Sequence, residues 1–95
     1  MKMEWNKIYR KNPDIVSREI DNEMILVPVY RTSKDINEMY TLNRTARDIW
    51  NMVDGKNTIT DINRKMSASY KVDPHRLEED LKEFIRDMKE IKAIE

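Results

Sequence analysis

Few side chains in this sequence are of the types that do chemistry, and they lie far apart. His75 is the only histidine, Gly55 is the only glycine, and there is no cysteine. These counts exclude a thiol nucleophile, a zinc–thiolate centre, a polyhistidine metal site and a glycine-rich phosphate loop. The run 78–80 offers three neighbouring carboxylates, but it lies on a predicted helix with no partner acid implied elsewhere. We therefore predict no catalytic residue, no metal site and no bound cofactor.

Charge and hydropathy limit the partners of the protein. The 95 residues include 18 Lys and Arg and 18 Asp and Glu, so the net charge is zero, whereas nucleic-acid-binding domains are usually strongly basic. No apolar run approaches the ~20 residues of a membrane span, and the first residues lack the apolar stretch of a signal peptide. Together with the absence of cysteine, these features indicate a cytoplasmic protein that binds neither nucleic acid nor membrane.

The chain has the length of one domain, and we expect residues 15–95 to hold its hydrophobic core. Residues 1–14 form a separate N-terminal segment. It carries Trp5, Ile8 and Tyr9 at helical spacing and ends near Pro13. The pattern leaves open whether this segment is a short helix, a strand or a flexible tail that orders on a partner.

The residues after this segment predict a small antiparallel sheet. Apolar and β-branched residues gather over 15–20 and 24–30, and the turn between them, Asp21-Asn22, tolerates a positive φ. Pro28 lacks an N–H, so we expect it at an edge, at a bulge or at the end of its strand. A polar connection over 31–37 leads to a short third strand over 38–42, where side chains alternate between two faces.

Three helices are predicted in the remaining sequence. Asn43 is a favourable N-cap for the first, and Asp54-Gly55 is expected to end it with the glycine in the left-handed conformation. Its buried face is predicted from apolar residues at i, i+3, i+4 and i+7. These residues are Ala46, Ile49, Trp50 and Val53.

The second and third helices each begin with a recognisable cap. Thr58 and Asp61 have the spacing of a capping box for a helix over 58–69, and Ile59, Ile62 and Met66 mark its buried face. Asp73 is an N-cap with Pro74 at the first helical position of the third helix. A stripe over about four turns predicts its buried face. The stripe consists of Leu77, Leu81, Phe84, Ile85, Met88 and Ile91.

The order β-β-β-α-α-α suggests an α+β fold of the winged helix-turn-helix type, and particular residues resemble one family. The shared residues are Pro13, Arg18, Glu23 and Tyr70, with the patterns LNxTAxxIW over 42–50, DGxxTIxxI over 54–62 and LxxDLxxFIxxM over 77–88. The sequence is similar to the PqqD family, named for pyrroloquinoline-quinone biosynthesis, and the resemblance spans residues 13–91. The chain departs from the family pattern where Asp21-Asn22 replaces the usual glycine of the first turn.

The resemblance implies a non-catalytic RiPP recognition element. Such a domain binds the leader of a ribosomally made precursor peptide and presents it to a modifying enzyme, often a radical S-adenosylmethionine (SAM) enzyme. The leader is expected to pair as an extra strand with the edge of the third strand and to lie against the last helix, which is β-augmentation. The implied peptide-binding residues are Glu38, Met39, Tyr40, Thr41, Leu42, Arg76, Leu77, Asp80, Leu81 and Phe84.

A second hypothesis is a winged-helix DNA-binding regulator. It requires basic residues on the recognition helix, because phosphate contacts dominate affinity for DNA. The helix predicted over 58–69 carries only Arg64 and Lys65, against Asp61. Five acids between 78 and 87 make the last helix equally unsuitable.

The last helix has two flanks of opposite charge. Asp80, Glu83, Asp87 and Glu90 lie on one side of the helical wheel, and Lys82, Lys89 and Lys92 lie on the other. An ordinary solvated face explains this arrangement, and so does a flank that selects the charge of a bound leader. The sequence does not decide which flank faces the groove.

Overall fold

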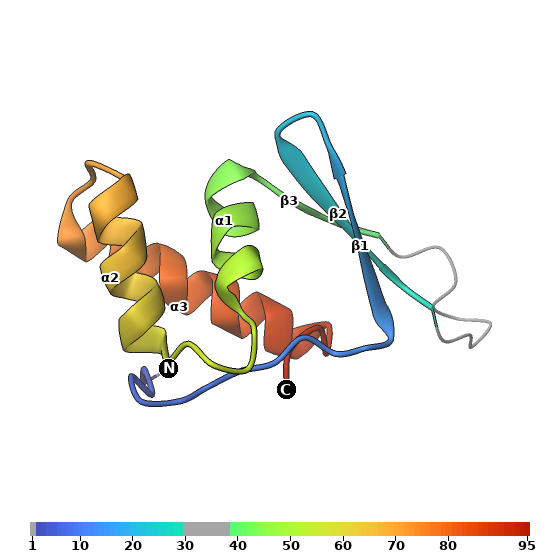
Figure 1. Cartoon of the computed structure of the whole chain (residues 1–95), viewed down its shortest axis with the longest axis horizontal. Helices are drawn as coiled ribbons and strands as arrows, with labels where there is room; N and C mark the ends of the chain where they lie inside the picture. Colours follow the sequence, from blue (N-terminus) through green and yellow to red (C-terminus); the bar gives the residue numbers. More distant parts are fainter. Residues whose placement is uncertain (1, 30–38) are drawn as a thin grey trace.

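Three strands followed by three helices make up the computed structural model, which describes residues 2–29 and 39–95 (Figure 1). The elements are β1 (Ile15–Ile20), β2 (Glu23–Pro28), β3 (Tyr40–Leu42), α1 (Arg44–Met52), α2 (Ile59–Ser69) and α3 (Pro74–Glu90). The strands form one antiparallel sheet in the order β1-β2-β3. The β1–β2 hairpin projects from the helices as a wing, and β3 leads directly into α1. The predicted α+β order is confirmed.

The predicted hairpin is confirmed, and the third strand is shorter than predicted. Asp21 takes the left-handed φ of 56° in the turn, and Pro28 is the last residue of β2. Strand β3 begins at Tyr40. Met39 precedes it with 65% of its surface exposed. Its side chain gains little from burial, so packing does not extend the strand to this residue. Glu38, the predicted first residue of this strand, lies outside the described residues, as does the end of the predicted second strand.

The sheet packs one face on the helices. Met24, Leu26 and Leu42 are buried, whereas Val16 and Ile20 on the other face are about half exposed. This alternation follows from the period of two along a strand. The predicted helix stripes form the rest of the core. Its fully buried helical side chains include Ile49, Trp50, Ile62, Met66, Leu81 and Met88. Ala46, predicted to be buried, is only partly so.

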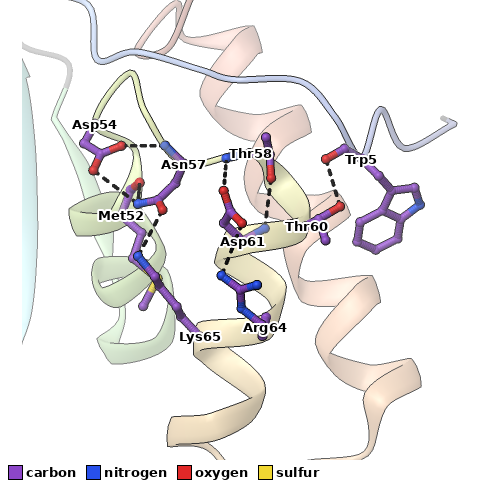
Figure 2. A network of polar contacts seen from close by, with 9 residues as sticks. All are labelled: Trp5, Met52, Asp54, Asn57, Thr58, Thr60, Asp61, Arg64 and Lys65. Atoms are coloured by element: carbon purple, nitrogen blue, oxygen red, sulfur yellow. Dashed lines mark hydrogen bonds and ion pairs between the residues drawn. The ribbon is translucent and has the colours of Figure 1, made fainter.

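The end of α1 differs from the prediction. The helix already ends at Met52, and its C-cap Val53 has an extended conformation. Gly55 has the expected left-handed φ of 77°, but in the turn that follows the helix. The Asp54 carboxylate shapes this turn by accepting the backbone N–H groups of residues 56 and 57, each at 2.9 Å. Figure 2 shows the bond to Asn57. A Cβ at Gly55 would lie 2.9 Å from Cγ of Arg10, so the site requires glycine on two counts.

The predicted caps of α2 and α3 are confirmed. The Asp61 carboxylate accepts the N–H of Thr58, and the Thr58 hydroxyl accepts the N–H of Asp61, both at 3.0 Å (Figure 2). The hydrogen bonds from Thr58 hold the pKa of Asp61 below its usual range. At α3, the Asp73 carboxylate accepts the N–H of His75 at 3.0 Å. These caps fix where both helices start.

The N-terminal segment, whose conformation the sequence leaves open, runs in an extended path along the helices to β1 (Figure 1). Its carbonyl groups accept N–H groups from the α1–α2 turn and the start of α2: Tyr9 from Gly55 at 3.0 Å, and Lys7 from residue 59 at 3.1 Å. Arg10 exchanges two hydrogen bonds of 2.9 Å with Glu95 near the other end of the chain. Tyr9 is only 5% exposed. Residues 3–12 are therefore part of the packed structure.

A polar network joins α1 to the end of α2 and to the sheet. Asp48 accepts a hydrogen bond from the Tyr70 hydroxyl and pairs with Arg47 at 3.0 Å, and Arg47 also lies 3.4 Å from Glu19 of β1. Burial alone would raise the pKa of Asp48, but the hydrogen bonds from Tyr70 and Arg47 outweigh it and hold that pKa below its usual value. The carboxylate form of Asp48 thus stabilises the folded state.

The pH dependence of stability is expected to report this network. The Asp48 contribution should be fully present above pH 3.8, the ordinary pKa of the group, and should be lost as pH falls through the lower pKa of the folded state. Asp48→Asn should therefore be less stable than the wild type near neutral pH, with a difference that shrinks in acid. Urea unfolding from about pH 7 to about pH 3 measures this. Glu79→Gln, on the exposed side of α3, is the control, and a difference for Asp48→Asn that does not vary with pH would contradict the assignment.

Candidate functional site

A groove of about 300 Å³ lies where β3, α1 and α3 meet. Six of the residues singled out from the sequence line it: Tyr40, Thr41, Leu42, Arg76, Asp80 and Phe84. The strand residues come from the edge of the sheet, because β3 is the last strand in the order β1-β2-β3. The helix residues follow one another at intervals of four, which places them on one side of α3. Tyr40 of β3 and Arg76 of α3, which are 36 positions apart in the chain, therefore line the same groove.

Of the singled-out residues that the structure describes, three do not line the groove. Leu77 and Leu81 are 2% and 0% exposed and belong to the core, because they lie on the side of α3 that packs against the rest of the molecule. Met39 is exposed ahead of β3 and is not part of the wall. Glu38 lies outside the described residues.

Helix α1 forms a wall that the sequence analysis did not anticipate. Asn43, Thr45, Ala46 and Ile49 all line the groove, and the partial burial of Ala46 follows from this position. Asn43 also caps α1, because its side chain accepts the N–H of Ala46 at 2.9 Å. The N-cap role already explains Asn43 in the sequence, and a place on the apolar stripe already explains Ala46. The sequence therefore carried no separate signal for their place in the groove.

The hydrogen-bond pattern of the sheet shows which way the backbone of β3 faces. The N–H of Val29 donates to the carbonyl of Asp14 at 2.8 Å, at the end of the β1–β2 ladder. Along an antiparallel ladder, residue pairs that exchange backbone hydrogen bonds alternate with pairs that do not. Ile25 of β2 lies four residues before Val29, so its N–H and C=O are also directed to β1. Thr41 lies opposite Ile25. The N–H and C=O of Thr41 therefore point away from β2, towards the open edge of the sheet.

Three of the four acids on the acidic flank of α3 line the groove. Asp80, Glu83 and Asp87 all line it, and Arg76 is the only basic side chain in its wall among the described residues. The hydroxyl of Tyr40 donates to Asp87 at 3.1 Å and links β3 to α3. Burial, and then this hydrogen bond, raise the pKa of Tyr40, so the hydroxyl stays protonated as a donor. The groove thus combines an open strand edge with an acidic helix face.

The sequence matches the family described as "Coenzyme PQQ synthesis protein D (PqqD)" over residues 23–94. This chain belongs to the PqqD family. The match covers all the elements from β2 to α3, including both sides of the groove. The resemblance inferred from the residue patterns is therefore confirmed. No match was found among curated proteins.

Two solved structures share the PqqD-type fold of this chain. One is TbiB1 in complex with the TbiA(beta) leader peptide, with a TM-score of 0.75 and 23% identity over 90% of this chain and 94% of that one. The other is lasso peptide synthetase B1 complexed with the leader peptide, with a TM-score of 0.76 and 21% identity over 94% of this chain and 99% of that one. The three-strand, three-helix architecture is common to all three proteins.

No group of three or more His, Cys, Asp or Glu side chains in residues 2–29 and 39–95 has the arrangement to hold a metal ion. Across the same residues, no helix combines the length and apolar character needed to cross a membrane.

Proposed function

We propose that this chain binds the leader segment of a ribosomally made precursor peptide and presents it to a modifying enzyme, without doing chemistry itself. The observation that carries the proposal is the open edge of β3, where the N–H and C=O of Thr41 face outward beside the groove. An extended segment that pairs there becomes a fourth strand, and its side chains alternate between the groove and solvent. Both proteins of similar fold are in complex with leader peptides, which supports a leader peptide as the ligand.

The partner enzyme that we propose rests on the resemblance to the PqqD family. A radical SAM enzyme in the cytoplasm is the partner that we propose, with this chain supplying the leader and no cofactor of its own. A gene for a short peptide beside a gene for such an enzyme, next to the gene for this chain, would support the pathway. A neighbourhood without any peptide gene would argue against it.

The surface of α2 gives no support to the DNA-binding hypothesis. Its two basic side chains are engaged locally: Arg64 pairs with Asp61 at 3.3 Å, and Lys65 donates to Asn57 at 3.0 Å (Figure 2). A DNA phosphate would have to compete with these local partners. We expect no discrete complex with DNA below micromolar protein in a gel shift at physiological salt.

Thr41→Pro is expected to weaken strand addition at the groove while the fold persists. Proline removes the outward N–H and therefore one hydrogen bond to the bound strand, which should weaken affinity by at least about 1 kcal/mol. Peptides selected from a display library of random twelve-residue sequences serve as the probe, and calorimetry measures their affinity. Helical circular dichroism should be unchanged.

Two further variants keep this test specific. Thr41→Ala retains the backbone N–H and should bind as the wild type does. Tyr40→Pro removes an N–H that faces β2 and should damage the sheet itself. Equal affinity of Thr41→Pro and Thr41→Ala for the selected peptides would rule out pairing at this edge.

A further inference from the structure

We infer that the groove selects a peptide carrying Lys or Arg at an inward-facing position, two residues from an apolar side chain. This inference rests on the proposed function and deepens it by naming the chemistry of the bound segment. It follows from the flank of α3 that faces the groove, because three of the four charged side chains in its described wall are acids. The chain as a whole has a net charge of zero, so the negative charge is a local property of this surface.

The alternation of an added strand defines which peptide residues meet these acids. Side chains of Tyr40 and Leu42 lie on the helix-facing side of β3: Leu42 is 1% exposed, and Tyr40 reaches Asp87. Peptide residues opposite these two positions therefore point towards α3, and the residue opposite Thr41 points to solvent. The two inward positions are separated by roughly 6.8 Å.

The acids on α3 are spaced to meet one of these two positions. Asp80 and Glu83 are separated by roughly 4.5 Å along the helix axis, so a single ammonium or guanidinium group can contact both. Asp87 is already engaged, because it accepts the Tyr40 hydroxyl at 3.1 Å and lies 3.5 Å from Arg86. No described residue forms an ion pair with Asp80 or Glu83. These two carboxylates are therefore the available partners for a basic side chain.

The floor of the groove is the reason why we expect an apolar side chain two residues from the Lys or Arg of the peptide. Ile49, Phe84 and Met88 line the groove although each is at most 5% exposed, which makes its bottom apolar. An apolar side chain at the second inward position can cover this floor. The methylene stem of a Lys or Arg at the first position can also pack on Phe84 while its charged end reaches Asp80.

Two of the three lysines on the basic flank of α3 have partners away from the groove, and none of the three lines it. Lys82 pairs with Glu78 at 3.3 Å, and the Lys89 ammonium lies 5.3 Å from the centre of the Tyr9 ring, over the N-terminal segment. The two flanks noted in the sequence thus have different surroundings. One packs beside residues of the same chain, and the other faces the groove.

A double-mutant cycle tests the inference. The probe is the tightest peptide selected from the random twelve-residue library, and its Lys or Arg is replaced by Gln. For the wild-type protein, this replacement should weaken binding about fivefold, the effect of one or two partly exposed ion pairs. For Asp80→Asn/Glu83→Gln, the same replacement should change affinity by less than about twofold, since the partners are gone. Calorimetry at low and physiological salt measures both.

The matched control is Glu79→Gln/Glu90→Gln, which removes two exposed acids of the same helix that do not line the groove. It should retain the fivefold preference. Selected peptides that bind at Thr41 but show no enrichment in Lys or Arg would overturn this inference and leave the proposed function standing. A failure of the library to yield any peptide whose binding depends on Thr41 would overturn both.

Discussion

Replacing Trp50 by alanine is expected to lower the free energy of unfolding by about 3–5 kcal/mol, the usual cost of deleting a buried aromatic ring. Trp50 is the largest of the fully buried side chains, at 1% exposure, and it lies on the face of α1 that joins the sheet to the other helices. A domain of this size has a total stability of about 5–15 kcal/mol. The variant should therefore unfold at a much lower urea concentration, which chemical denaturation measures.

Trp50→Phe is the control for this experiment. It keeps an aromatic ring and removes the indole N–H, which is buried without a hydrogen-bond partner among the described residues. The phenylalanine variant should lose clearly less stability than the alanine variant, because the cavity that it leaves is smaller. A loss below about 1 kcal/mol for Trp50→Ala would contradict the central role of this residue in the core.

Deleting residues 1–12 is expected to destabilise the domain by at least about 3–5 kcal/mol, as much as the loss of one buried aromatic side chain. The deletion removes the 5% exposed Tyr9 from the hydrophobic cluster and leaves its space in the core unfilled. It also leaves the N–H of Gly55 and the N–H of Glu95 without their partners, Tyr9 and Arg10. Urea or thermal unfolding of the shortened chain measures the loss.

Tyr9→Ala in the full-length chain separates the side chain from the backbone pairing. It should lose a large part of the stability that the deletion loses, because both remove the same ring. Lys2→Ala, at an exposed residue near the start of the segment, should have no effect. Unchanged stability of the shortened chain would mean that residues 15–95 fold by themselves, as the sequence suggested.

The helices were predictable because their determinants are local. The stripe over 77–88 repeats with the helical period and a cap precedes it, so the sequence contains both the start of α3 and its buried face. The same holds for the capping box that begins α2. Short-range spacing was sufficient for each of these, because helix geometry relates residues three and four apart.

The features that could not be predicted depend on contacts between distant parts of the chain. Residues 7–12 of the N-terminal segment are extended only because they pair with residues 55–59 and 93–95, and their own pattern suits a helix equally well. The turn after α1 is also held from a distance, because the N–H of Gly55 donates to the carbonyl of Tyr9. Local propensity has no access to either cause.

The candidate groove was predictable in part. A strand edge and one side of α3 followed from the family resemblance, and the structure places six of those residues around one hollow. The contribution of α1 was missed because its groove residues also cap the helix or cover its apolar stripe. The sequence could not show which flank of α3 faces the groove. A helical wheel gives the flanks only relative to each other, and the buried positions of Leu81 and Phe84 are needed to orient them in the fold.

The pairing of Arg10 with Glu95 has a consequence for the order of folding. These residues are joined by two backbone hydrogen bonds across nearly the whole chain, and each doubling of such a loop costs about 0.6 kcal/mol in closure entropy. The helices and the hairpin need only short loops, so they should form early in the folding reaction. The N-terminal segment should dock last, after the transition state, and mutations such as Tyr9→Ala should speed unfolding more than they slow folding.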